Sequence, residues 1–334
     1  NPDAPLYNKY GVAGDINADG YPEIFVATAG QITALTHDGK IYATTPTYYP
    51  CMGGLSLGDT DYDGIFELYL NERDYYYHDN FQGKGVRAFY ASNLTERWNH
   101  PEMLSSSHCP TLVDVDKDGI LDVVSLQQWG GGIAVYNSTT GAPIRETLNI
   151  PGMKTHSQPT IYDIDGDGNV ELITCRDWSL PYIWDLYAWE LDAILPYGCW
   201  EPPAIADLDG DGKVEIIACG QDNISIYDNN YQLIGNISLD NPNNYGMSYI
   251  VAHDVDEDGL NELVLNRRSS IYVYDTLSSS PNPEAQSQFN FYSQHRGRAP
   301  YFVQYGPSDP VIQDNKPNNN AINQILNPTL SIYI

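Results

Sequence analysis

The sequence predicts an all-β fold, a β-propeller of four-stranded blades, on three observations. A short acidic segment recurs six times in the 334 residues, short apolar runs flank each copy, and no apolar stripe with helical spacing is present. The copies begin 44, 55, 49, 44 and 47 residues apart, close to the ~40 to 50 residues of a propeller blade. They read DINADGYPE (15–23), DTDYDGIFE (59–67), DVDKDGILD (114–122), DIDGDGNVE (163–171), DLDGDGKVE (207–215) and DVDEDGLNE (254–262), and are called loops one to six.

Each loop is predicted to join two antiparallel strands. Apolar runs such as residues 112–113, 161–162 and 205–206 come before the loops, and runs such as 24–26 and 263–265 come after them. These runs are short, rich in β-branched residues and bounded by turn residues, which is typical of buried strands rather than helices.

A second hairpin is predicted in most repeats, about ten residues further on. Residues 32–35 are followed by the turn residues Asp38 and Gly39, and residues 133–136 and 224–227 also run into turn residues. Two hairpins per repeat give four strands per blade. Six such blades account for the repeats, and a seven-bladed ring whose last blade is built from the two termini is the alternative.

The predicted propeller domain covers residues 1–298. Residues 299–334 are predicted to form an irregular linker, rich in Gly, Pro and Asn, and a strand-like tail at 330–334. This tail packs back on the propeller, begins a further domain, or adds as a strand to a neighbouring molecule and so supports self-assembly.

The charge balance excludes several partners. The chain has 44 Asp and Glu against 16 Lys and Arg, so nucleic acid is not expected as a partner, because binding there relies on basic side chains that neutralise phosphates. No apolar run is long enough for a membrane-spanning helix. The five cysteines show no CxxC spacing, which argues against zinc and leaves disulfides open.

The chain is expected to be exported. It begins with Asn1 rather than Met, which indicates a processed or excised form, so a missing leader does not argue against secretion. Four Asn-x-Ser/Thr triplets would be glycosylation acceptors in an exported protein; they begin at Asn93, Asn137, Asn223 and Asn236.

The loops have the composition of calcium sites. Counted from the first Asp, positions 1, 3, 5 and 9 carry acidic or amide oxygens in all six copies, and position 6 is Gly. Calcium takes six to eight oxygen ligands, and Gly allows the turn that brings the carbonyl of position 7 to the ion. Magnesium suits such a flexible shell less well. An EF-hand is excluded, because position 12 is never acidic and strands rather than helices flank the loops. The alternative is that Asp and Gly only form turns.

The repeated Asp-x-Asp-x-Asp-Gly-x-x-Asp/Glu loops, with a lead-in such as YGVAG at 10–14, resemble the FG-GAP and VCBS repeats of integrin-α-type β-propellers over residues 10–298. The resemblance implies about six calcium ions, each held by the side chains at positions 1, 3, 5 and 9 and the backbone at position 7. The implied ligands are Asp15, Asn17, Asp19, Tyr21, Glu23; Asp59, Asp61, Asp63, Ile65, Glu67; Asp114, Asp116, Asp118, Ile120, Asp122; Asp163, Asp165, Asp167, Asn169, Glu171; Asp207, Asp209, Asp211, Lys213, Glu215; and Asp254, Asp256, Asp258, Leu260, Glu262.

Two consequences follow from this assignment. Loop one has three carboxylates instead of four, because Asn17 stands at position 3, and is expected to bind more weakly. Of the 44 acids, 23 belong to ligand positions, so much of the formal charge of −28 belongs to the sites rather than to a solvated acidic surface.

The first functional hypothesis is an extracellular or cell-surface module, stabilised by calcium, that acts in adhesion, surface or filament assembly, or attachment to a protein or glycan. Extracellular calcium fills sites even of ~0.1 to 1 mM affinity. The alternative is a polysaccharide lyase, because calcium-loop propellers also resemble the catalytic domains of some such enzymes. A base and a sugar-stacking surface would then come from Tyr75, Tyr76, Tyr77, His78, His108, His156, Trp178, Trp184 and Trp189.

Overall fold

The computed structural model describes residues 11–50, 54–72, 85–100, 109–126, 132–149, 159–175, 180–197, 199, 201–208, 211–220, 222–239, 248–253, 261–267 and 270–274. Within these residues the secondary structure consists of strands and turns, with no helix. The prediction of an all-β fold is confirmed.

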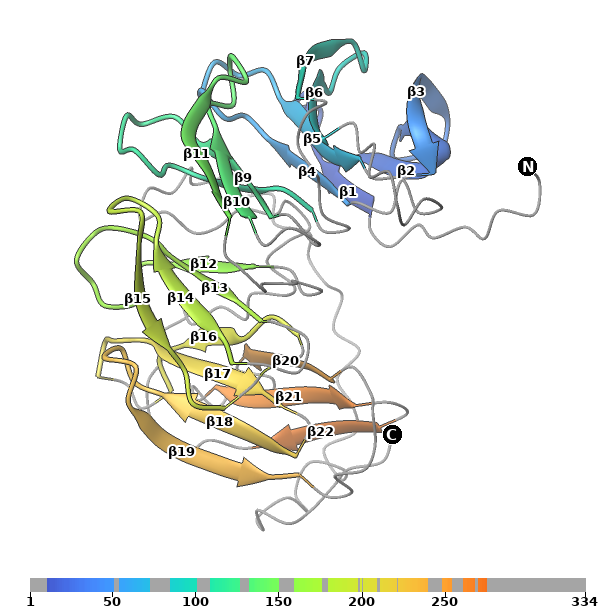
Figure 1. The fold of residues 1–334 in the computed structure, drawn as a ribbon. Helices are drawn as coiled ribbons and strands as arrows, with labels where there is room; N and C mark the ends of the chain where they lie inside the picture. Colours follow the sequence, from blue (N-terminus) through green and yellow to red (C-terminus); the bar gives the residue numbers. More distant parts are fainter. Residues whose placement is uncertain are drawn as a thin grey trace.

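The strands form six antiparallel sheets that follow one another along the chain (Figure 1). Four sheets have four strands each, and the first and last have three in the described residues. The sheets are β1 (Gly11–Gly14), β2 (Glu23–Leu35), β3 (Ile41–Pro50); β4 (Leu55–Gly58), β5 (Glu67–Glu72), β6 (Gly85–Tyr90), β7 (Glu96–His100); β8 (Thr111–Val113), β9 (Asp122–Leu126), β10 (Gly132–Tyr136), β11 (Pro143–Asn149); β12 (Thr160–Tyr162), β13 (Glu171–Thr174), β14 (Tyr182–Asp185), β15 (Glu190–Ile194); β16 (Ala204–Ala206), β17 (Glu215–Cys219), β18 (Asn223–Tyr227), β19 (Leu233–Ser238); and β20 (Ser248–His253), β21 (Glu262–Arg267), β22 (Ser270–Tyr274).

The first sheet differs from the predicted four strands. Residues 24–26 and 32–35, which the sequence suggested as separate strands, belong to the single strand β2. Its first part pairs with β1 and its second part with β3, and the register shifts between Ala29 and Gln31. Gly30 lies at this shift with a φ of 89°, a conformation that a residue with a side chain rarely adopts. The two predicted strands are therefore one strand with an irregularity at Gly30.

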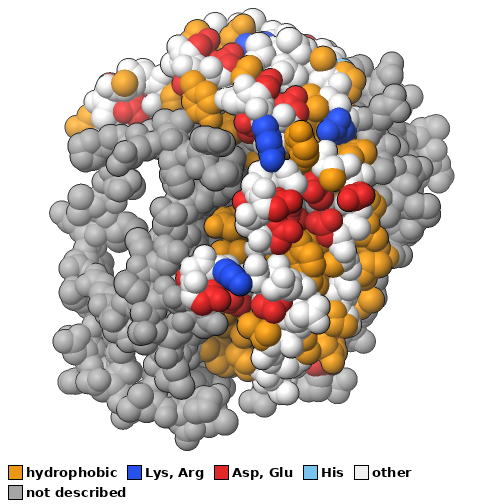
Figure 2. All heavy atoms as spheres, turned by 90° about the vertical axis from the view of Figure 1, so that its left-hand side faces the viewer, with side chains coloured by type: hydrophobic (Ala, Val, Ile, Leu, Met, Phe, Trp, Pro, Cys, Tyr) orange, Lys and Arg blue, Asp and Glu red, His pale blue; other side chains and the backbone are white. Residues whose placement is uncertain are grey.

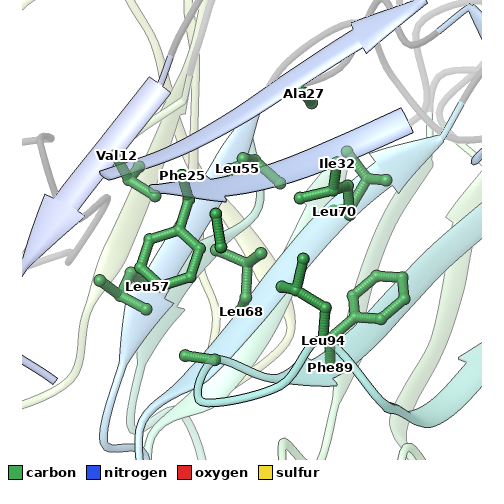
Figure 3. Close-up of a cluster of buried hydrophobic side chains, with 12 residues drawn as sticks. Val12, Phe25, Ala27, Ile32, Leu55, Leu57, Leu68, Leu70, Phe89 and Leu94 are labelled. Atoms are coloured by element: carbon green, nitrogen blue, oxygen red, sulfur yellow. The ribbon is translucent and has the colours of Figure 1, made fainter. Parts of the chain in front are cut away.

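The core lies between neighbouring sheets. Figure 3 shows one such region, where side chains of β1 and β2 pack against those of β4, β5 and β6. Phe25 and Ile32 of the first sheet contribute to the same buried cluster as Leu57 and Leu68 of the second. Similar clusters join the second to the third sheet and each later sheet to the next, as far as the sixth. We call these regions the seams.

In the second to fifth sheets the strand after the loop is buried on both faces, whereas Ile24 of β2 in the first sheet is exposed. Successive side chains of a strand point to opposite faces, so Leu68 of β5 packs in the seam with the first sheet and Tyr69 packs in the seam with the third. Ile216 and Ile217 of β17 are divided in the same way between the fourth and sixth sheets. This explains the continuous apolar runs that follow the loops, since both faces need apolar side chains.

One disulfide strengthens a seam. Cys175, directly after β13, is bonded to Cys199, ahead of β16, with 5.4 Å between their Cα atoms. Both belong to the buried cluster between the fourth and fifth sheets. The sequence left the pairing of its five cysteines open, and the fold brings these two together.

Several predictions lie outside the described residues. They are the closure of the ring by the termini, which concerns the choice between six and seven blades, the linker from residue 299, and the tail at 330–334. In the described part of the chain, no helix is long and apolar enough to cross a membrane.

Candidate metal centres

Each acidic loop connects the first two strands of its sheet, as predicted. Loops one to five lie between β1 and β2, β4 and β5, β8 and β9, β12 and β13, and β16 and β17, and these strand pairs are antiparallel. Position 9 is the first residue of the second strand in every sheet. The acid there is thus held by the sheet, whereas positions 1 to 8 belong to the connection.

A common set of hydrogen bonds shapes the loops. The backbone N–H of the position 6 glycine donates to the Asp at position 1, with N–O distances of 2.8, 3.0, 3.0, 3.1 and 3.0 Å in loops one to five. The N–H of position 7 donates to the Asp at position 5 at 2.7 to 2.9 Å. The position 6 glycines of loops one to five have φ between 85° and 91°, which supports the predicted role of glycine in the turn.

Position 4 shares a conformation that the sequence did not reveal. Its φ is 57° at Ala18, 59° at Tyr62, 65° at Lys117 and 80° at Gly166. Residues other than Gly adopt this left-handed conformation only at a cost, so the loop imposes it. The backbone turns twice within three residues, and the carboxylates of positions 1, 3 and 5 are gathered around the turn.

The acid at position 9 is buried in all six loops, and the surroundings of its second oxygen differ between them. One of its oxygens accepts a hydrogen bond from the backbone N–H of position 2, at 3.2, 3.4, 3.0, 2.6 and 2.6 Å in loops one to five. Asp122 has no exposed surface, so water does not reach its other oxygen. That oxygen has no hydrogen-bond partner in the described part of the chain. An unpaired buried carboxylate oxygen is costly, which indicates that a cation belongs beside it.

Three loops bring their acids close enough to share one ion. One oxygen from each of three acids lies within 4.8 Å of the other two in loops two, three and four; the groups are Asp59, Asp61, Asp63; Asp114, Asp116, Asp122; and Asp163, Asp165, Glu171. Buried oxygens of Asp59, Asp61 and Asp114 also have no hydrogen-bond partner among the described residues. All these donors are hard oxygens, so their chemistry fits calcium.

The electrostatics point to the same conclusion. Burial raises the pKa of Glu67 to about 7 and those of Asp122 and Glu171 to about 8, since the charged form loses its hydration. Burial also raises the pKa values of Asp59 and Asp114, and neighbouring loop acids add to the shift. A divalent cation would reverse these shifts, because it stabilises the ionised forms.

In loops one, five and six, the described acids form no such group of three, and some ligands of loops five and six are not described. In loop one, the side-chain amide of Asn17 donates to Glu23 at 3.3 Å, so this position faces the acid of position 9. Loop five contributes Asp207, Asp211, Lys213 and Glu215, and Asp209 lies outside the described residues. Of the implied ligands of loop six, only Glu262 is described, and Asp254, Asp256, Asp258 and Leu260 are not.

The turn between the third and fourth strands of one sheet reaches the loop of the preceding sheet. Thr139, between β10 and β11, donates to Asp61 of loop two at 3.4 Å. The ammonium group of Lys117 in loop three lies 4.7 Å from the centre of the Tyr187 ring, between β14 and β15. The loops thus lie at the seams, which the sequence could not show because the partners are far apart along the chain.

A further residue that the sequence analysis missed is Arg97 of β7, which forms ion pairs with Asp61 and Glu67 of loop two. Figure 2 shows acidic side chains gathered in separate patches on one face, with isolated basic side chains between them.

Two of the residues considered for a lyase lie in the described part of the chain. Trp184 and Trp189 pack against the seam between the third and fourth sheets rather than forming an open stacking surface. The others lie outside the described residues; they are Tyr75, Tyr76, Tyr77, His78, His108, His156 and Trp178.

Comparisons with known proteins agree with the repeat and the fold. Residues 114–174 and 207–278, which contain loops three to six, match the FG-GAP-like repeat. No curated protein matches the sequence. Solved structures of similar fold include BamB from Moraxella catarrhalis, with a TM-score of 0.52, 10% identity, and coverage of 76% of this chain and 70% of BamB.

Two other solved structures extend the comparison. BBS1N, solved in complex with ARL6DN, has a TM-score of 0.50 and 12% identity, covering 83% of this chain and 87% of its own. The V. cholerae biofilm matrix protein Bap1 has a TM-score of 0.51 and 13% identity, covering 86% of this chain and 52% of Bap1. At such identities the likeness shows the fold alone, which is of the β-propeller type.

Proposed function

We propose that this chain is an extracellular or cell-surface module stabilised by calcium. The module binds a protein or glycan or takes part in surface assembly, and it carries FG-GAP-like repeats on a propeller-type fold. The observation that carries the proposal is the geometry of loop three. There, Asp114 and Asp116 converge on Asp122, whose buried free oxygen has no hydrogen-bond donor among the described residues.

The residues that would hold calcium are the side chains at positions 1, 3, 5 and 9 of each loop, with the carbonyl of position 7. When bound, calcium supplies positive charge that offsets the repulsion between the gathered carboxylates and the cost of burying position 9. A site that is filled at 100 times its dissociation constant adds about 2.7 kcal/mol to the stability of the folded state. The role proposed for calcium is therefore structural.

Several features support an extracellular location. The Cys175–Cys199 disulfide is of the kind that persists in oxidising compartments, and extracellular calcium is abundant enough to fill weak sites. Asn93 and Asn236 of the glycosylation triplets lie on the surface. The likeness to a biofilm matrix protein supports the same location.

A binding or structural role is favoured because the acids gathered in the described loops have the donor chemistry of calcium sites. The similar fold of BBS1N is seen in complex with another protein, and Bap1 is a matrix protein. We extend this to a cell-surface partner of this chain, protein or glycan, and to self-assembly through residues 330–334.

The calcium part of the proposal is tested by native mass spectrometry and calorimetric titration of the full chain, made calcium-free on a chelating resin. We expect several calcium ions per chain, and one fewer in Asp122→Asn. The matched control is Asp38→Asn, because Asp38 lies in the turn between β2 and β3 and pairs with Lys40. This control should bind as many ions as the unaltered chain. Absence of calcium binding would refute the proposal.

The binding part is tested with a panel of acidic and neutral glycans and by light scattering of the chain itself. We expect retention of a glycan, or self-association, in calcium but not in calcium-free buffer. Loss of self-association on deletion of residues 330–334 would assign it to the tail. Release of products with unsaturated uronate absorbance from acidic polysaccharides would instead establish a lyase.

A further inference from the structure

A positive charge from a neighbouring strand lies beside loop two. Arg97 is the second residue of β7, the fourth strand of the same sheet. One terminal nitrogen of its guanidinium lies 2.8 Å from Glu67 Oε1 and the other lies 3.4 Å from Asp61 Oδ2. The side chain of Arg97 is 13% exposed and that of Glu67 is 1% exposed, so this ion pair is well shielded from water. Arg97 thus links positions 3 and 9 of the loop.

The oxygen that Arg97 contacts is the one that loop three leaves without a partner. In loop two, Glu67 Oε2 accepts the N–H of Thr60, and Oε1 is paired with Arg97 by charge, at 2.8 Å but without the geometry of a hydrogen bond. In loop three, Asp122 Oδ2 accepts the N–H of Val115 in the same way, and Oδ1 has no hydrogen-bond partner among the described residues. The guanidinium therefore occupies the place beside position 9 that is open in loop three.

The equivalent strands carry no positive charge at this position. Arg97 is the extra residue of β7 between the partners of Phe89 and Ala88, and the extra residues of the other strands are Ile144 in β11, Asp192 in β15 and Ile234 in β19. Asp192 adds a negative charge near loop four, the opposite of Arg97. Within the described part of the chain, no Lys or Arg forms an ion pair with an acid of loops one, three or four. Loop two therefore differs from these loops in its charge, although its acids follow the same spacing.

The position of the guanidinium is fixed by its surroundings. Its central carbon lies 5.4 Å from the centre of the Tyr90 ring, a favourable arrangement for a cation over an aromatic face. On the other side, Thr139 from the next sheet donates to the same Asp61 oxygen that Arg97 contacts. A calcium ion in this loop would lie close to a fixed positive charge and would compete with it for two carboxylates.

We propose that Arg97 is a built-in counter-ion, which stabilises loop two without calcium and makes this loop bind calcium more weakly than loops three and four. The proposal rests on the proposed function, since it concerns the same ion. Loop two has all four carboxylates, so its weaker calcium affinity would come from its surroundings and not from its own acids.

The test removes the charge and counts the ions. Arg97→Ile places at this position the residue that β11 and β19 carry there, and Arg145→Met is the matched control. Arg145 of β11 is also partly buried, but its guanidinium donates to the carbonyl of Tyr187 at 2.9 Å and not to a loop acid. Calcium is titrated into the full chain by calorimetry, with native mass spectrometry for the number of ions.

We expect Arg97→Ile to bind one more calcium ion tightly than the unaltered chain, with affinity at loop two raised by about tenfold or more, because a site's affinity follows the charge of its surroundings. In calcium-free buffer the same variant should melt at a lower temperature, and calcium should remove the difference. The control should show neither change. An unchanged number and affinity in Arg97→Ile would overturn the proposal.

A second comparison does not require an Arg97 variant that folds. In the unaltered background, Asp114→Asn should remove one tightly bound ion and Asp59→Asn should remove none. Equal losses from the two variants would overturn the role of Arg97 and leave the proposed function intact. If no calcium binds to the unaltered chain or to Arg97→Ile, the proposed function fails together with this inference.

Discussion

The seams and the loops use burial in opposite ways. In the seams, side chains such as Phe25 and Leu68 lose their water to apolar neighbours, so burial stabilises the fold directly. In the loops, Asp122 and Glu171 are just as deeply buried, but burial raises their pKa values and opposes the charged form. The seams therefore stabilise the contacts between sheets without an ion, whereas the proposed calcium sites would make the contribution of the loops depend on one.

Removal of calcium should have the largest effect on the stability of the protein. If several sites each contribute about 2.7 kcal/mol at saturation, their loss exceeds that of any single core side chain. We expect the melting temperature in calorimetry to fall by about 10 °C or more in calcium-free buffer, and magnesium to restore little of it, since it prefers to keep its waters. An unchanged melting temperature would show that the seams alone determine stability.

A core substitution should have the next largest effect, and calcium should not alter it. Ile32 is fully buried in the first seam, whereas Ile41 in the same sheet is 63% exposed. We expect Ile32→Ala to lower the free energy of unfolding by about 2 to 5 kcal/mol and Ile41→Ala to change it by about 0.5 kcal/mol or less. Denaturant unfolding with and without calcium measures both. A calcium-dependent cost of Ile32→Ala would mean that seams and loops do not act independently.

The pH dependence should separate the two regions further. In the calcium-free fold, burial raises the pKa values of Glu67, Asp122 and Glu171 at position 9 to about 7 to 8, above their ordinary values of 3.8 to 4.5. The folded state therefore holds more protons than the unfolded state in this range, so its stability is greatest at low pH and falls as the pH rises through about 8. With calcium bound, this fall should disappear, because calcium favours the ionised forms.

Melting temperatures between pH 4 and pH 9, with and without calcium, measure this difference. The variant Glu171→Gln mimics the protonated acid, so it should reduce the slope in calcium-free buffer. A calcium-free protein whose stability rises over the same range would contradict the assignment.

The smallest effect is expected in loop one. Asn17→Asp restores a fourth carboxylate, so the affinity of this loop for calcium should rise by a few-fold to about tenfold, because affinity follows the number of charged ligands. Gln31→Glu, at an exposed position in the second part of β2, adds the same charge away from the acidic loops and serves as the control. Equal changes in calorimetric titration of both variants would indicate a general effect of charge.

The sequence was most informative where the determinants are local. The spacing of positions 1 to 9 predicts the turn at Gly64 and the strand that begins at Glu67, because all the hydrogen bonds involved lie within the nine residues. The apolar runs predict strands for a related reason, since both faces of β5 and β17 must be buried. Period, fold class and candidate ligands therefore follow from short stretches.

Other features depend on contacts between distant residues. Arg97 meets Asp61 across 36 residues and Thr139 meets it across 78, and neither residue type is distinctive in its own segment. The pairing of Cys175 with Cys199 likewise depends on how the fourth and fifth sheets meet. The continuous strand β2 was missed because the irregularity at Gly30 looks like a turn in the sequence.

The bond between position 2 and the acid at position 9 has a consequence for chain length. It spans seven residues in each of loops one to five, and position 9 also begins the next strand. Because neighbouring strand residues face opposite seams, one extra residue in loop two would exchange Leu68 and Tyr69 between them. The fixed length of the loop therefore sets which alternate residues of the following strand face each neighbouring sheet. The repeat can vary in length in its other turns but not in the acidic loop.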